Sequence, residues 1–151
     1  MSTAEELRYL VLAAQREGNR ALAAGLRPLR LTPSQAEVLR VLADSKVLTL
    51  SGLGALLVCE SGTNPSRLVD RLVTQGLVER TRSEADGREV LLQLTSEGRR
   101  TAREVQVVES SLYAEIDRRA AGHDVEAVRR FLRDFVYGLP AGEAVSRRYP
   151  S

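Results

Sequence analysis

Cationic and hydrogen-bonding side chains gather in two neighbouring stretches of this chain. Ser66, Arg67 and Arg71 fall on the polar side of a segment with helical periodicity, and Arg82 and Arg88 flank a predicted turn. Guanidinium groups bind phosphates and the edges of bases, and the major groove of a duplex, about 12 Å wide, admits one helix. Residues of these types at this spacing therefore point to binding of nucleic acid.

The chain offers little for catalysis or for metal binding. Its one cysteine, Cys59, cannot form an intrachain disulfide, and together with the one histidine, His123, it cannot supply the clustered ligands of a structural zinc site. No set of nucleophile, base and orienting group can be named, and no glycine-rich phosphate loop is present. We therefore predict a protein that is not an enzyme, with no catalytic residues, no metal site and no cofactor.

The charge balance does not identify a partner. The 151 residues carry 22 basic and 20 acidic side chains, which gives a net charge of +2 and an isoelectric point near 9.0. The basic side chains are almost all arginine, because Lys46 is the only lysine. Attraction for nucleic acid must therefore come from the placement of arginines and not from a basic block.

Local signals predict the elements that position these arginines. The polar face belongs to a helix that begins at Asn64-Pro65, a cap and first-turn pair, and ends at Gly76. Two strands follow over 77–82 and 88–94, and Asp86-Gly87 predicts a tight turn between them. An amphipathic helix followed by such a hairpin predicts a winged helix.

Further helices surround this unit, each with a cap and an apolar stripe. Thr3, Thr32, Thr49, Thr95 and Asp124 are the predicted caps. The predicted bounds are 3–24, 33–43, 50–58, 96–120 and 125–138.

The fold class that follows is mainly helical with a small β-hairpin wing, in which terminal helices flank a winged helix-turn-helix. Glycine and proline in the last dozen residues predict a poorly ordered tail. The predicted parts are an N-terminal helix and linker over 1–30, the winged unit over 31–95, two C-terminal helices over 96–139 and a flexible tail over 140–151.

Nothing in the chain predicts a membrane partner. No apolar run approaches the roughly 20 residues that a bilayer span requires. The first six residues lack the basic start and apolar centre of a signal peptide. We therefore expect a cytoplasmic protein.

Three segments carry a resemblance to a known family. They are Leu31-Thr32-Pro33-Ser34-Gln35-Ala36-Glu37-Val38-Leu39, the stretch from Pro65 to Val78, and Asp86-Gly87-Arg88 followed by Val90, Leu92, Leu94, Thr95 and Gly98. The third is the most specific, because an Asp-x-Arg pair before a hydrophobic strand that ends in Leu-Thr recurs in the wing of that family. On these motifs nearly the whole chain resembles the MarR family of bacterial transcriptional regulators.

The resemblance implies an obligate homodimer, built from the helices over 3–24, 96–120 and 125–138. It also implies recognition of a pseudo-palindromic operator in double-stranded DNA, and transcriptional control that is usually repression. A small-molecule effector site is implied where the dimerisation and DNA-binding parts meet. The effector, the operator and the sign of regulation stay open.

Candidates for DNA contact lie at the start of the predicted recognition helix. Ser66, Arg67 and Arg71 are candidates to contact bases or phosphates. Asp70 is expected to orient an arginine by ion pairing. For Arg67 and Arg71 the alternative is a merely solvated role.

A phosphate can also be held at the N-terminus of this helix. Thr63 and Asn64, together with the exposed backbone amides there, offer hydrogen bonds and the positive end of the helix dipole. The alternative is that Asn64 and Pro65 only cap the helix.

Arg88 is the leading candidate on the hairpin. At the tip of a wing its guanidinium can enter the minor groove, where a narrow groove concentrates negative potential, and Asp86 can pre-orient it. Arg80 and Arg82 are candidates for flanking phosphates. The alternative is a surface Asp-Arg pair that stabilises the hairpin by under about 1 kcal/mol.

The terminal helices carry more apolar surface than the small central unit can cover, and dimerisation would cover it. Two-fold symmetry would then place two recognition helices in successive major grooves, roughly 34 Å apart. The alternative is that these helices close on themselves within a monomer. The predicted interface residues are Leu7, Leu10, Val11, Val108, Leu112, Ile116, Leu132 and Phe135.

Two other functions stay open. The near-neutral charge of the winged region favours a protein-interaction module that does not bind DNA. A thiol-based redox-sensing regulator would use Cys59, for which the alternative is an ordinary packed thiol. His123 lies between two predicted helices and could be a ligand contact or a pH-sensitive hinge, for which the alternative is a simple turn residue.

Overall fold

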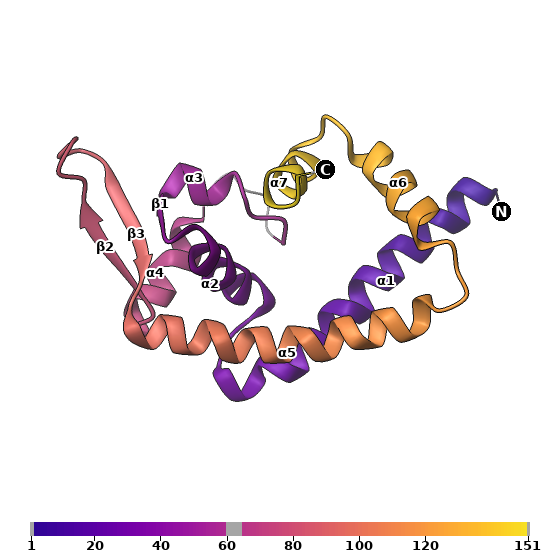
Figure 1. Cartoon of the computed structure of the whole chain (residues 1–151), viewed down its shortest axis with the longest axis horizontal. Coiled ribbons are helices and arrows are strands. Elements are labelled where there is room, and N and C mark those ends of the chain that lie inside the picture. The colour runs from indigo at the N-terminus through magenta and orange to yellow at the C-terminus, as the bar shows by residue number, and fades with distance from the viewer. Residues whose placement is uncertain (1, 60–64, 151) are drawn as a thin grey trace.

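Helices make up most of the molecule, and a small antiparallel sheet lies at one end of it (Figure 1). The computed structural model describes residues 2–59 and 65–150. The expected fold class, mainly helical with a β wing, is confirmed. In chain order the elements are α1 (Thr3–Leu26), the 3-10 turn η1 (Arg27–Leu29), α2 (Pro33–Ser45), β1 (Val47–Thr49), α3 (Leu50–Gly54), α4 (Ser66–Thr74), β2 (Val78–Arg82), β3 (Val90–Leu94), α5 (Ser96–Ala120), α6 (Val125–Val136) and α7 (Pro140–Arg148).

The hydrophobic core lies where α2 meets α4, β3 and α5. Leu39 and Leu42 of α2 are almost fully buried. This helix begins as predicted, because the Thr32 hydroxyl accepts from the Gln35 amide at 3.2 Å and the Gln35 side chain accepts from the Thr32 amide at 3.0 Å. A firmly capped and buried α2 therefore forms the platform for the winged unit.

The sheet has three strands in the order β1-β3-β2, and both pairings are antiparallel. Val78 pairs with Leu94 at the base of the wing, where β3 turns Leu92 and Leu94 into the core. Val90, at the distal end of β3, is 39% exposed. The sequence prediction missed β1, because three residues are too few to show an alternating pattern.

The connection between β2 and β3 differs from the prediction. The loop covers residues 83–89, so Asp86-Gly87 does not make a two-residue turn. Gly87 lacks the positive φ that a type I′ turn requires. Instead the Glu89 amide donates to the Asp86 carbonyl at 2.9 Å, and the Ser83 amide donates to the Glu89 carbonyl at 2.9 Å. The wing tip is therefore broader than expected.

Several helix boundaries and caps also differ: α1 and α2 end two residues later than predicted, and α6 ends two residues earlier. Ser2, not Thr3, caps α1, since its hydroxyl accepts from the Glu5 amide at 3.2 Å. The helix predicted over 50–58 ends at Gly54, because its two glycines give it a low helical propensity. For α4 the cap position is Pro65; Asn64, the predicted cap, lies outside the described residues.

The predicted flexible tail is wrong for residues 140–148, which form α7. Pro140 occupies the first turn of this helix, where a missing amide costs nothing. Gly142 lets α7 approach the end of α6, because a Cβ there would overlap the Val136 carbonyl oxygen. Proline and glycine thus mark a helix start and a close crossing in this segment.

The last turn of α7 shapes the surroundings of Tyr113 on α5. Burial raises the pKa of the Tyr113 phenol, and Glu109 and Tyr149 raise it further. Arg40 and Arg148 oppose that shift. Residues from α2, α5 and the end of α7 therefore share one electrostatic environment.

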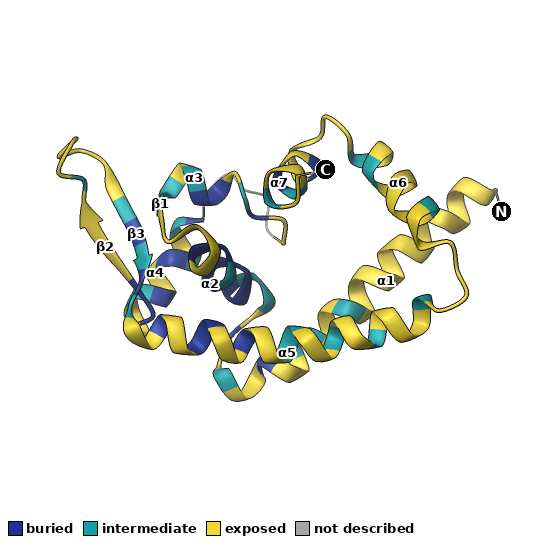
Figure 2. Ribbon diagram, viewed as in Figure 1, coloured by how far each residue is buried: buried dark blue, intermediate teal, exposed yellow. Residues whose placement is uncertain are grey.

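The long helix α5 joins the wing to the other end of the molecule (Figure 1). Its predicted bounds are confirmed, with the Thr95 hydroxyl accepting from the Gly98 amide at 3.0 Å. Only the half of α5 near the wing has buried residues; the other half, most of α1 and α6 are largely exposed (Figure 2). No helix in the described part of the chain is long and apolar enough to cross a membrane.

We predict that Gly98→Ala destabilises the fold by about 1 to 3 kcal/mol, because the new methyl group would overlap the Leu77 carbonyl oxygen and force backbone movement. Gly18→Ala is the matched control. Nothing lies within 4 Å of a Cβ at that position, so removing an interior helical glycine should stabilise by up to about 1 kcal/mol. Thermal or urea unfolding measures both, and equal stabilities for the two variants would contradict the role of Gly98.

Candidate nucleic-acid interface

Helix α4, the predicted recognition helix, is strongly two-sided. Val69 and Leu72 are fully buried against the core, and Leu68 is partly buried. Arg67 and Arg71 are exposed on the other side. Burial of the apolar stripe therefore fixes which side chains of α4 face solvent.

Asp70 does not pair with either arginine of its own helix. It forms an ion pair with Arg80 of β2, so the expected orienting role exists but with a different partner. The Asp70 and Arg80 side chains are 61% and 41% exposed, and such pairs contribute little to stability. The positive charge of Arg80 therefore offsets the negative charge of Asp70 on the exposed face of α4. Arg67 and Arg71 make no ion pair with any carboxylate that the structure describes.

The wing loop holds its own backbone. Asp86 Oδ1 accepts from the backbone amide of Arg88 at 3.0 Å, in place of the expected contact with the Arg88 guanidinium. Arg82 Nη1 donates to the Gly87 carbonyl at 2.8 Å, so that guanidinium lies against the loop. Arg88 is exposed, and no ion pair to a carboxylate of the described chain is found for it. The hydrogen bonds therefore fix the backbone of Arg88 and leave its guanidinium at the surface.

The junction between α4 and the wing is tied by backbone and side-chain hydrogen bonds. Gly76 ends the helix region with φ at +75°, a conformation that favours glycine. The Thr95 hydroxyl donates to the Gly76 carbonyl at 2.6 Å, and the Thr95 amide donates to the Leu77 carbonyl at 3.1 Å. These bonds set the position of the wing relative to α4.

Other candidate residues lie at the edges of this surface. Ser66, the first residue of α4, is partly buried. Thr63 and Asn64 lie outside the described residues. Thr74 and Gln75 line a hollow of about 330 Å³ beside Asp70 and Arg71. Helical spacing places Thr74 on the same polar side as Arg67 and Arg71, whereas Gln75 was not predicted.

The residues expected at a dimer interface fall into two groups. Val108 and Leu112 are partly buried by their own chain, and Val108 packs on the backbone of α1 at Gly25. The others are exposed, most strongly Phe135 at 68%. These exposed residues are Leu7, Leu10 and Val11 of α1, Ile116 of α5, and Leu132 and Phe135 of α6.

Cys59 and His123 are both exposed. The Cys59 amide donates to the Glu37 side chain at 2.8 Å. His123 lies in the turn between α5 and α6, where its amide donates to the Ala120 carbonyl at 3.0 Å. Within residues 2–59 and 65–150 no group of acidic, histidine or cysteine side chains could hold a metal ion.

Comparisons with known proteins give this surface a context. A family model for a winged helix DNA-binding domain matches residues 31–98. The organic hydroperoxide resistance transcriptional regulator of Bacillus subtilis (strain 168) is 35% identical over 98 residues. The aligned part covers 65% of this chain and 66% of that protein, just under two thirds of its length.

Solved structures extend the match beyond the winged unit. A cysteine-to-serine variant of MarR from E. coli, crystallised with operator DNA, superposes with a TM-score of 0.76 and 28% identity, over 87% of this chain and 94% of that one. An organohalide-sensing regulator in its 2,4-dichlorophenol-bound form shares the fold, with a TM-score of 0.80 and 16% identity over 93% of this chain and 83% of that one. The chain belongs to the MarR family of winged helix DNA-binding transcriptional regulators.

Proposed function

We propose that this protein acts as a homodimer that binds a pseudo-palindromic operator in double-stranded DNA and represses transcription until a small molecule releases it. The observation that carries the proposal is the set of exposed arginines on α4 and the wing that lack a carboxylate partner in the described chain. They are Arg67, Arg71 and Arg88. The structure of E. coli MarR with operator DNA supports the choice of ligand.

In this proposal α4 enters the major groove. Arg67 and Arg71 contact base edges or phosphates, and Ser66 adds a hydrogen-bonding group at the start of the helix. Thr63 and Asn64 lie next to the N-terminus of α4, where backbone amides and the helix dipole attract a phosphate.

The wing contributes through Arg88, which enters the minor groove beside the site that α4 reads. Its backbone is held by Asp86, so less conformational freedom is lost when the guanidinium binds. Arg82 and Arg80 are exposed but already contact the Gly87 carbonyl and Asp70 of their own chain, so they reach flanking phosphates only with their remaining donors.

A second copy of the chain would cover the exposed apolar side chains of α1, α5 and α6. A lone chain that leaves Ile116 53% exposed and Phe135 68% exposed has an unpartnered surface of the kind that marks interfaces. Two-fold symmetry then presents two α4 helices to successive major grooves, roughly 34 Å apart.

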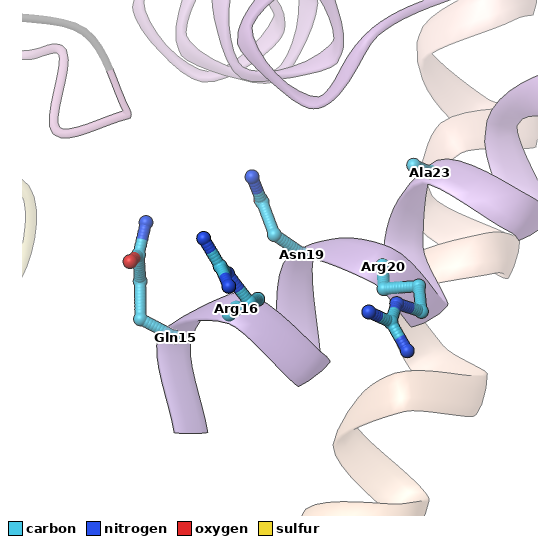
Figure 3. A pocket seen from close by; sticks show the side chains of 5 residues that line it. All are labelled: Gln15, Arg16, Asn19, Arg20 and Ala23. Carbon is cyan, nitrogen blue, oxygen red and sulfur yellow. The ribbon is translucent and has the colours of Figure 1, made fainter. Parts of the chain in front are cut away.

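We place the effector near α1, which connects the proposed dimer interface to the winged unit. A hollow of about 530 Å³ runs along this helix, and Gln15, Arg16 and Asn19 project from the same side of it (Figure 3). An effector that favours a spacing of the two α4 helices unlike that of the operator would lower DNA affinity, because it binds one state better than the other.

A thiol-based signal is a second candidate for the release step, since the exposed Cys59 is the only cysteine and the B. subtilis relative is named for organic hydroperoxide resistance. Operator titration of wild type and Cys59→Ser, with and without an organic hydroperoxide, tests it. Loss of affinity on oxidation in wild type alone would support the thiol, and equal behaviour would exclude it.

The first prediction concerns the ligand itself. Operator affinity should fall steeply with salt, because each neutralised phosphate contributes about 0.9 to the slope of log affinity against log salt concentration. Selection from random duplexes would supply the operator, and fluorescence anisotropy would measure the slope. Absence of binding to every duplex at low salt would leave only the alternative, a winged-helix protein-interaction module.

A second prediction concerns the wing. Arg88→Ala should weaken operator binding by about 1 to 3 kcal/mol and flatten the salt slope, because a groove contact is lost while the fold is unchanged. Arg118→Ala, which removes an exposed arginine from the far end of α5, is the control. If both variants titrate like wild type in a gel shift, the wing does not take part.

A third prediction concerns the dimer. Leu112→Asp and, independently, Phe135→Asp should yield monomers in sedimentation, because each buries a lone carboxylate in an apolar contact. Phe135 is the cleaner site, since its exposure in the single chain means that the fold does not depend on it. Val107→Asp changes a residue of α5 that is 69% exposed and is not among the predicted interface residues, so it should leave the dimer intact. Dimers in all three variants would place the interface elsewhere.

A further inference from the structure

A buried carboxylate lies between α2, the segment that follows α3, and α7. Glu37 of α2 is only 7% exposed, although it carries a charge. Its Oε1 accepts from the Val58 amide at 2.8 Å and from Arg148 Nη1 at 2.6 Å, and its Oε2 accepts from the Cys59 amide at 2.8 Å. One side chain thus joins three parts of the chain that are distant in sequence.

The burial of Glu37 requires all of these partners. An ionised carboxylate out of water is costly unless donors surround it, and an opposite charge must share its site. Two backbone amides and one guanidinium supply both conditions, and the Arg148 side chain is itself only 20% exposed. Removing one partner would leave the other charge buried without compensation.

The amides that Glu37 holds belong to the approach to the recognition helix. Regular helix α3 ends at Gly54, and α4 begins at Ser66. Val58 and Cys59 are the last two residues described before the stretch 60–64, and Pro65 follows that stretch at the start of α4. Because no helical ladder fixes these two residues, the Glu37 carboxylate is the group that holds their amides.

α7 contacts the same segment at a second point. Arg147 Nη1 donates to the Ala55 carbonyl at 3.2 Å. Arg148 lies over the Tyr149 ring at 5.5 Å, which limits the directions in which its guanidinium can point. The two arginines of α7 therefore bracket residues 55–59, one through a carbonyl and the other through Glu37.

We propose that Glu37 and Arg148 are positioning residues for operator binding, which latch α7 to the segment that leads into the recognition helix. The inference rests on the proposed DNA-binding function and adds a route to it. α6, which immediately precedes α7, carries the exposed Phe135 that we assign to the dimer contact. In this proposal a shift of α6 and α7 acts through Arg148 and Glu37 on Val58 and Cys59, which precede α4 in the chain.

The test uses Arg148→Ala and Glu37→Gln in the full-length protein. Both should speed hydrogen exchange of the Val58 and Cys59 amides by at least about tenfold, because each variant weakens the same buried network. Operator affinity should fall by a factor in the range of about 5 to 150 that is typical of coupling between sites. The salt slope should stay at the wild-type value, since neither residue contacts phosphate, and this separates positioning from direct contact.

Two comparisons control for general damage. Arg129 of α6 pairs with Glu126, and the two side chains are 59% and 65% exposed. Arg129→Ala should therefore leave both amide hydrogen exchange and operator affinity unchanged. Arg148→Lys keeps the positive charge and should restore part of the affinity. In the double variant Glu37→Gln, Arg148→Ala, the second change should add little to the first, because both act on one network.

The outcomes separate this inference from the proposed function. If wild type binds no duplex at low salt, the proposed function fails. If wild type binds its operator while Arg148→Ala and Glu37→Gln bind equally well and exchange their Val58 and Cys59 amides at the wild-type rate, the latch is wrong and the proposed function stands. A loss of affinity with a reduced salt slope would instead make Arg148 a direct phosphate contact and overturn its positioning role.

Discussion

The structure depends on one constraint, which is that α4 must bury its apolar stripe against α2. Val69 and Leu72 have no exposed surface. Burying one apolar side chain of this size stabilises the folded state by roughly 1.5 to 3 kcal/mol. The rotation of α4 about its axis is thereby fixed, and Arg67 and Arg71 are directed to solvent. The packing of the core thus determines which side chains can read a ligand.

Ion pairs and hydrogen bonds then decide which of the exposed arginines are left without a partner in the described chain. The net charge of +2 gives no strong field, so affinity for a polyanion depends on which cations are left uncompensated. Asp70 is neutralised by Arg80, and Arg82 is held by the wing backbone. The protein therefore uses part of its arginine content to build the surface, and presents Arg67, Arg71 and Arg88 from it.

Much of the fold could be predicted from local signals, because caps and apolar periodicity act over a few residues. Thr32 and Thr95 specify the starts of α2 and α5, and Gly76 the end of α4. Contacts between distant segments could not be predicted in this way. The Asp70 pair with Arg80, the three-residue β1 and the docking of α7 each depend on what lies opposite in space. For the same reason the burial of Glu37 could not be predicted, because its partners Val58, Cys59 and Arg148 lie far from it in sequence.

The long helix α5 explains why the two ends of the molecule can act together. It carries the core residue Val105 near the wing and the exposed Ile116 near α6, so one helix packs on the winged unit and also reaches the proposed dimer contact. The ion pair of Arg40 with Glu109, at 3.0 Å and largely buried, fixes α5 to α2. Glu37, on the same helix α2, holds Arg148 of α7. Helix α2 is therefore tied by ion pairs both to α5 and to α7, and these are the two contacts through which we propose that a change at the dimer contact reaches the winged unit.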